Sequence, residues 1–90
     1  MSNAQAVRIC IADDHQLIID GIKSLLAGFP NYKIVGEASN GNELIALVDK
    51  IQPDVVIVDI EMPEMNGIDA TGAIVKKHPK RKVIALTMHN

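Results

Sequence analysis

The chain has 90 residues, which make one small domain at most. Apolar residues make up 48% of it and charged residues 22%, a balance typical of a folded globular domain that argues against disorder. The formal net charge of -2 gives no overall positive field, so the composition does not favour nucleic acid or an anionic membrane as a partner.

The first predicted strand covers residues 7–12, with the β-rich sequence "VRICIA". Residues 1–6, which begin "MSNA", are interpreted as a tag or a disordered N-terminus. Cys10 lies in the strand and is the one cysteine, so we expect a buried, reduced thiol. No signal-peptide pattern precedes the strand, and no apolar run approaches the roughly 18 to 20 residues of a membrane span. We therefore expect a cytoplasmic protein.

A helix is predicted after Asp13 and Asp14, because apolar residues recur there at helical spacing. Gly28 and Pro30 are expected to stop it. The residues expected on its buried face are Leu17, Ile18, Ile22, Leu25, Leu26 and Phe29.

The next segment repeats the order of strand and helix. Residues 33–38 form the second predicted strand. Asn40 and Glu43 have the spacing of a capping pair at the start of a helix, and Pro53 closes that helix. Its apolar face is expected to comprise Leu44, Leu47, Val48 and Ile51.

The third predicted strand, residues 54–59, leads into the loop 60–67, "IEMPEMNG". We expect this loop to turn the chain so that backbone carbonyl groups face the end of the strand. A helix follows that carries Ile68, Ile74 and Val75, with a break at Pro79. The fourth strand covers residues 82–87.

A cationic cluster, "KKHPKRK", covers residues 76–82. It is interpreted as a helix end followed by a solvated turn, because no aromatic residue interleaves it for base stacking. Since it precedes the fourth strand, it should lie at the opposite end of the sheet from the acidic strand ends. We expect no direct nucleic-acid contact by this segment.

Alternation of strands and helices predicts a flavodoxin-like, doubly wound α/β fold with a parallel sheet. Three of the four strands are continuous aliphatic runs, which predicts that both of their faces are covered.

Four polar residues fall where predicted strands end: Asp13 and Asp14, Asp59, and Thr87. In a parallel sheet these ends share one edge, where binding sites form. Each residue alone also has a structural explanation as a cap, a turn residue or a β-former. Two carboxylates about 4 Å apart, however, repel by roughly 4 kcal/mol at an effective dielectric constant near 20. Such a cluster needs protons or a cation.

Magnesium fits this need best, because Mg²⁺ takes oxygen ligands and is typically held by one or two carboxylates together with phosphate oxygens. His15 is the one nearby zinc-ligand candidate, and we interpret it as a first-turn helix residue. Asp59 is the expected phosphoryl acceptor. A carboxylate is a weak nucleophile, but it can accept a phosphoryl group when a metal ion neutralises the neighbouring carboxylates and the phosphate oxygens. Asp13 and Asp14 are the expected metal-holding residues.

Four stretches carry a family resemblance: "IADDH" at 11–15, "VGEASNGNE" at 35–43, "DIEMPEMNG" at 59–67 and "VIALT" at 83–87. In this order and at these separations they resemble the receiver domain of bacterial two-component response regulators. The sequence of these stretches is most similar to that of receivers that carry a LuxR-type helix-turn-helix output domain.

The resemblance implies that a sensor histidine kinase donates a phosphoryl group to Asp59. It also implies a Mg²⁺ ion held by Asp14, Asp59 and the backbone carbonyl of Glu61, with Asp13 supporting these ligands from one layer further out. Receivers are signalling switches and not turnover enzymes.

Three further residues match functional positions of the family. Thr87 matches the switch hydroxyl that turns toward the phosphoryl group, and Pro63 and Gly67 match the loop-shaping positions. These matches imply a phosphorylation-dependent switch that drives an output, which in this subfamily is transcription regulation.

The resemblance covers residues 7–90 and predicts a partial, C-terminally truncated receiver. The family's fifth strand, its lysine and the last helices have no counterpart here. Strand 82–87 should then be an exposed edge, prone to association, and we expect a fragment of a longer regulator or a dimer or swapped oligomer through that edge. An output domain, present or missing, is an expectation from the resemblance.

Three other functions are alternatives to the hypothesis of a phosphorylation-dependent receiver. A degenerate interaction module that works without phosphorylation is the main alternative, because the lysine has no match. An aspartate-nucleophile phosphohydrolase would have a second Asp at the position of Glu61. A flavodoxin-like cofactor binder would need a phosphate-binding loop where "DDHQ" stands.

Overall fold

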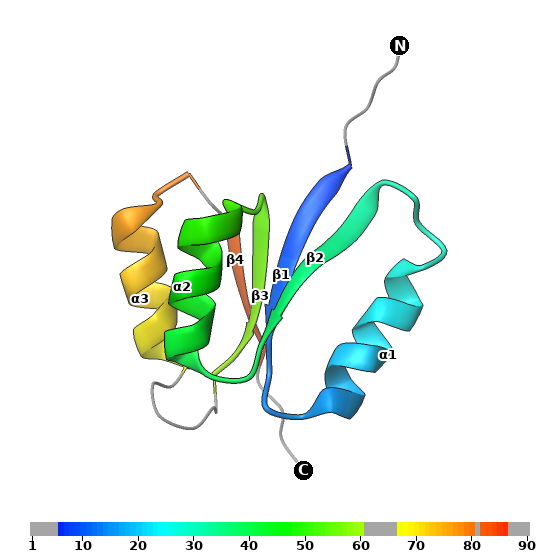
Figure 1. The fold of residues 1–90 in the computed structure, drawn as a ribbon, viewed down its shortest axis with the longest axis horizontal. Helices are drawn as coiled ribbons and strands as arrows, with labels where there is room; N and C mark the ends of the chain where they lie inside the picture. Colours follow the sequence, from blue (N-terminus) through cyan, green and yellow to red (C-terminus); the bar gives the residue numbers. More distant parts are fainter. Residues whose placement is uncertain (1–5, 61–66, 81, 87–90) are drawn as a thin grey trace.

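The computed structural model describes residues 6–60, 67–80 and 82–86, in which strands and helices alternate. Figure 1 shows the chain passing from strand to helix along its length. The elements are β1 (Val7–Ala12), α1 (Gln16–Leu26), β2 (Tyr32–Ala38), α2 (Gly41–Ile51), β3 (Val55–Asp59), α3 (Gly67–Lys77) and β4 (Lys82–Leu86).

The strands form one parallel sheet in the order β2-β1-β3-β4. The predicted parallel α/β fold is therefore confirmed. The central strands β1 and β3 pair with Ala12 beside Val58, and β3 pairs with β4 with Asp59 beside Leu86. The carboxyl ends of these strands therefore lie together at one edge of the sheet.

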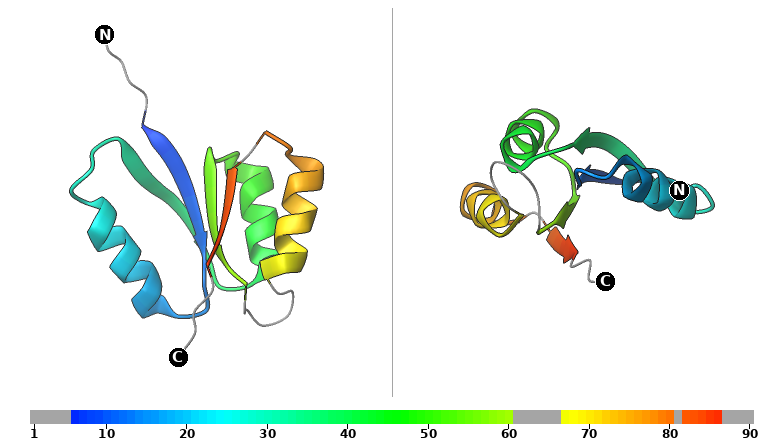
Figure 2. Two further views of the ribbon diagram at one scale, coloured as in Figure 1. Left: turned by 180° about the vertical axis from the view of Figure 1, so that it is seen from behind. Right: turned by 90° about the horizontal axis from the view of Figure 1, so that it is seen from below.

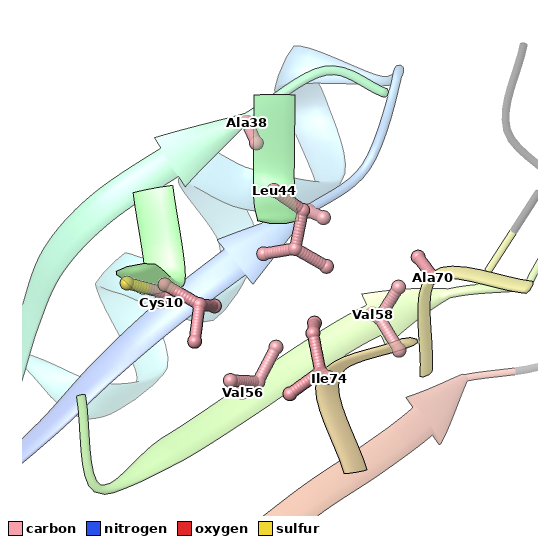
Figure 3. Close-up of a cluster of buried hydrophobic side chains, with 9 residues drawn as sticks. Cys10, Ala38, Leu44, Val56, Val58, Ala70 and Ile74 are labelled. Carbon is pink, nitrogen blue, oxygen red and sulfur yellow. The ribbon is translucent and has the colours of Figure 1, made fainter. Parts of the chain in front are cut away.

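One face of the sheet is covered by α2 and α3, as the end-on view in Figure 2 shows. The side chains between them are almost wholly buried, and Figure 3 shows several of these small aliphatic groups packed together. The buried cluster comprises Cys10, Ala12, Ala38, Leu44, Val48, Val56, Val58, Ala70 and Ile74. Burial raises the pKa of the Cys10 thiol, although the Arg8 charge opposes this, so Cys10 is an inert core residue as expected.

The opposite face carries α1, which packs Ile19 against Ile9 and Ile11 of β1. The prediction for the buried face of this helix was partly wrong: Leu17 is 84% exposed and Leu25 73%. Residues 19, 22 and 26 form the stripe that faces the sheet, whereas residues 17 and 25 belong to the neighbouring stripe. Phe29 is also exposed and lies beyond the helix, which ends at Leu26.

The expectation that both faces of the strands are covered is also only partly met. Val56 and Val58 are fully buried, but Val55 and Ile57, which point to the α1 side, are only half-buried. Ile84 of the edge strand β4 is 50% exposed. The physical reason is that α1 packs over β1 and β2, so the β3 and β4 part of this face has less cover among the described residues.

The start of α2 and its packing on β2 each depend on a particular residue. Asn40 caps the helix by accepting a hydrogen bond from the Glu43 backbone N–H at 2.8 Å, so the predicted capping pair is confirmed. The sheet register shifts beside Val35, and a Cβ on Gly36 would lie 2.9 Å from a methyl group of Leu47. Gly36 thus lets α2 approach β2 closely.

Charged groups at the amino end of the sheet are paired. Arg8 donates to the backbone carbonyl oxygens of Ile51 and Gln52, both at 3.0 Å, where α2 ends in a left-handed residue. Between α2 and α3, Asp49 contacts Lys77 at 2.7 Å and His78 at 2.8 Å. The described part of the cationic cluster thus lies at the end predicted for it.

No helix within the described ranges is long and apolar enough to cross a membrane.

Candidate functional site

The carboxyl edge of the sheet brings three of the predicted site residues together. Asp13 and Asp14 follow β1 directly, and Asp59 is the last residue of the adjacent strand β3. The backbone N–H of Asp13 donates to the Ala38 carbonyl oxygen at 3.0 Å, which fixes the start of this turn to β2. One carboxylate oxygen from each Asp, together with a ring nitrogen of His15, lies within 4.8 Å of the others.

The other predicted site residues cannot be located in this way. Glu61, Pro63 and Thr87 lie outside the described residues. Gly67 is described as the first residue of α3. The assigned roles of these four residues stay predictions.

Burial differs sharply among the three carboxylates. Asp13 and Asp59 are each only 2% exposed, whereas Asp14 is exposed. The Asp13 Oδ1 atom accepts hydrogen bonds from the His15 backbone N–H at 2.9 Å and its ring Nδ1 at 3.0 Å. The Asp13 Oδ2 atom is buried, and no described residue donates a hydrogen bond to it. A buried carboxylate oxygen without a donor is costly, and a proton or a cation can relieve that cost.

His15 also lies in this cluster, whereas the sequence analysis interpreted it as a first-turn helix residue. Its Nδ1 atom is 3.0 Å from Asp13 Oδ1 and also 3.0 Å from Asp14 Oδ1. The hydrogen bond to Asp13 and the negative charge of Asp14 raise the pKa of His15. The signal in the sequence was its position directly after two aspartates at a strand end.

A hollow of about 240 Å³ opens beside the cluster. Asp13 and Asp14 line one side of it, and Glu37, Ser39 and Glu43 line the side formed by β2 and the start of α2. Glu43 accepts from the backbone and hydroxyl groups of Ser39, both at 2.9 Å, and these hydrogen bonds lower its pKa. The site is therefore open to solvent on a side that is strongly acidic.

The donor set fits a hard divalent cation. Carboxylate oxygens from two strands converge, and one buried oxygen lacks a hydrogen-bond donor among the described residues. Such oxygens are the ligands that Mg²⁺ prefers. Carboxylate groups within 4.8 Å of one another repel, so a bound cation is favoured.

The chain was compared with known protein families and structures. A family model described as "Response regulator receiver domain" matches residues 9–90. The chain belongs to this family. The predicted receiver identity is thus confirmed, and the acidic cluster lies on a receiver sheet.

Individual relatives agree with this result. The receiver is 39% identical over 88 residues to the transcriptional regulatory protein DegU of Brevibacillus brevis, a match that covers 98% of this chain and 37% of DegU. A LuxR-family two-component response regulator from Aurantimonas sp. SI85-9A1 superposes with a TM-score of 0.88 at 31% identity, covering 96% of this chain and 61% of that one.

A third similar structure is the isolated REC domain of RcsB from Salmonella enterica serovar Typhimurium, solved in the presence of the phosphomimetic BeF₃⁻. It superposes with a TM-score of 0.88 at 31% identity, covering 96% of this receiver and 64% of that chain. The present chain therefore spans well under half the length of DegU and about two thirds of this REC domain.

Proposed function

We propose that this receiver accepts a phosphoryl group on Asp59 from a sensor histidine kinase in a Mg²⁺-dependent reaction. The observation that supports the proposal most strongly is the position of Asp59. It ends a central strand, it is 2% exposed, and the carboxylates of Asp13 and Asp14, which follow the adjacent strand β1, lie within 4.8 Å. Val56 and Val58 before it are packed against α2 and α3, which fixes the position of the strand end.

The chemistry of the proposed step is a simple displacement at phosphorus. An oxygen of Asp59 forms a bond to the phosphorus atom while the bond from phosphorus to an imidazole nitrogen of the kinase breaks. The electron pair of that bond stays on the imidazole nitrogen, which then takes up a proton. The product is an acyl phosphate on Asp59 and a neutral histidine on the kinase.

The metal is proposed to be held by Asp14, Asp59 and the backbone carbonyl of Glu61, with Asp13 behind them. A bound Mg²⁺ would neutralise the oxygens of the incoming phosphoryl group. The buried Oδ2 of Asp13 supports this assignment, because no described residue satisfies it. The chain's own contribution is to hold its carboxylates in place before the phosphoryl group arrives.

The proposed switch acts through residues near the same edge. Thr87 would turn toward the phosphoryl group, and Pro63 and Gly67 would shape the loop after β3. The output is proposed to be transcription regulation through an attached domain, which the name of the DegU relative supports. Residues 7–90 would be the partial receiver, and the edge strand β4 is the proposed surface for a dimer or a swapped oligomer.

A binding and phosphorylation assay tests this function. Beryllofluoride and a small acyl phosphate are added to the wild-type chain, to Asp59→Asn and to Asp20→Asn, with and without Mg²⁺. Asp20 is an exposed carboxylate on α1, so Asp20→Asn makes the same charge change away from the site. We expect Mg²⁺-dependent beryllofluoride binding and a mass increase of one phosphoryl group in the wild type and in Asp20→Asn.

Asp59→Asn should show neither response. A folded wild-type chain that responds to neither reagent would contradict the proposal and favour the degenerate interaction module. Steady release of inorganic phosphate from phosphomonoesters would instead favour a phosphohydrolase.

A further inference from the structure

His15 occupies a helix-capping position but does not cap the helix. It is the N-cap residue of α1, and its side chain makes no capping hydrogen bond. Residues with short oxygen-bearing side chains are preferred there, because they can accept from the first N–H groups of the helix. The ring of His15 is instead directed at Asp13 and Asp14.

A hydrogen bond alone leaves this arrangement incomplete. The Nδ1 atom lies 3.0 Å from a carboxylate oxygen of Asp13 and 3.0 Å from one of Asp14. Because Nδ1 carries at most one proton, it cannot donate fully to both oxygens. A single proton on Nδ1 is therefore shared between two carboxylate oxygens.

The same distances suit ligands that share one metal ion. A Zn²⁺ ion with four ligands is tetrahedral, and bonds of about 2.0 to 2.1 Å place its ligand atoms about 3.3 to 3.4 Å apart. The ligand atoms of Asp13, Asp14, His15 and Asp59 lie within 4.8 Å of one another. The two contacts of Nδ1 at 3.0 Å are near this spacing, and the widest pair would have to move closer by up to roughly 1.4 Å.

We propose that His15 is a nitrogen ligand of the acidic cluster at the carboxyl edge of the sheet. This ligand lets the cluster bind a borderline divalent ion such as Zn²⁺ in place of Mg²⁺. The inference rests on the proposed cation site and adds to it a fourth ligand and a second class of metal. Mg²⁺ selects oxygen ligands, whereas imidazole suits Zn²⁺, Ni²⁺ and Cu²⁺. The buried Asp13 Oδ2, which no described residue satisfies, is a second sign that a cation belongs here.

The molecule contains a matched comparison for this histidine. His78 lies at the other end of the sheet, where its Nε2 contacts a carboxylate oxygen of Asp49 at 2.8 Å. There the second oxygen of Asp49 is taken by Lys77 at 2.7 Å. His78 thus has one carboxylate that is already neutralised, whereas His15 has two carboxylates nearby and Asp59 within reach.

The experiment is calorimetric titration of the 90-residue chain with Zn²⁺ and, separately, with Mg²⁺ at about pH 8, where an ordinary imidazole is neutral. The variants are His15→Gln, which keeps a hydrogen-bond donor but is a poor metal ligand, and His78→Gln as the control. We expect His15→Gln to weaken Zn²⁺ binding at least about tenfold. Mg²⁺ affinity should change by less than about twofold, and His78→Gln should bind Zn²⁺ as the wild type does.

A spectroscopic readout accompanies the titration. In ¹H–¹⁵N spectra of the imidazole groups, Zn²⁺ should shift the Nδ1 resonance of His15, and Mg²⁺ should not. Unchanged Zn²⁺ affinity in His15→Gln, or an unshifted His15 nitrogen at saturating Zn²⁺, would overturn the inference while leaving the Mg²⁺ site intact. If neither metal binds the folded wild-type chain, the cation site itself is wrong and the inference falls with it. Retained Mg²⁺ binding and an unchanged circular dichroism spectrum show that a variant is folded.

Discussion

The two ends of the parallel sheet handle charge in opposite ways. At the amino end, Arg8 neutralises the carbonyl oxygens at the end of α2, and Asp49 bonds to Lys77 and His78. At the carboxyl end, Asp13, Asp14 and Asp59 converge, and His15 lies among them. The amino end is therefore built for stability, whereas the carboxyl end keeps a repulsion that a ligand can relieve.

The largest expected effect comes from removing the cation at the amino end. Arg8→Met removes two charge-assisted hydrogen bonds to the Ile51 and Gln52 carbonyl oxygens, so we expect it to lower the free energy of unfolding by about 2 to 3 kcal/mol. Lys33→Met is the control, because Lys33 is an exposed cation that pairs with Arg8 in the β1–β2 register. Urea unfolding followed by circular dichroism measures both. Equal losses in the two variants would mean that the Arg8 hydrogen bonds add nothing beyond net charge.

At the carboxyl end, removal of a charged group is expected to raise the free energy of unfolding. In the absence of metal, Asp13→Asn should raise the free energy of unfolding by about 2 kcal/mol, because it removes one of the mutually repelling charges. The new amide group can also donate to neighbouring carboxylates, where Asp13 Oδ2 had no donor among the described residues. The measurement is again urea unfolding, with Asp20→Asn as the control of equal charge change. A destabilised Asp13→Asn chain would show that the cluster is not strained by its charges.

Magnesium should relieve the same repulsion in the unmodified chain. At ten times its dissociation constant, a ligand that binds only the folded state stabilises it by about 1.4 kcal/mol. We therefore expect Mg²⁺ to raise the melting temperature of the wild type, with NaCl at equal ionic strength as the control. Asp59→Asn and Asp14→Asn should lose this increase, whereas Arg8→Met should keep it. A Mg²⁺ effect that survives in all four chains would be a nonspecific salt effect.

The contrast between the two ends could be read only in part from the sequence. The acidic end was predictable, because Asp13, Asp14 and Asp59 each stand directly where an apolar run ends, and strand ends of a parallel sheet meet. The pairing of charged groups at the amino end was harder to predict. The contacts of Arg8 and Asp49 join residues 28 to 44 positions apart in the sequence, and no local pattern encodes such separations.

The buried face of α1 was also predictable only in part from the sequence. Its apolar residues occupy two adjacent stripes, so periodicity alone could not choose between Ile19 and Leu17 as the buried position. That choice was made by β1, whose Ile9 and Ile11 pack against Ile19. His15 was considered as a metal ligand but interpreted as a first-turn helix residue for a related reason, since the sequence showed its neighbours but not the direction of its ring.

The smallest expected effect concerns acid sensitivity at the amino end. Hydrogen bonds from Lys77 and His78 lower the pKa of Asp49 below its ordinary value of 3.8. A carboxylate with a depressed folded-state pKa contributes stability that is present above pH 3.8 and is lost as the pH falls through the folded-state pKa. Asp49→Asn should therefore be slightly less stable than the wild type at neutral pH, and the difference should shrink as the pH falls below about 4.

Thermal unfolding of Asp49→Asn and the wild type across this range measures the effect, and Lys77→Met should reproduce it because it removes one of the partners that lower the Asp49 pKa. Asp20→Asn should keep a constant offset, which separates the loss of a paired carboxylate from a general change of charge. If the gap between Asp49→Asn and the wild type stays constant down to pH 3, the Asp49 contacts carry no pH-dependent stability. The amino end would then resemble an ordinary solvated surface, and the difference between the two ends would rest on Arg8 alone.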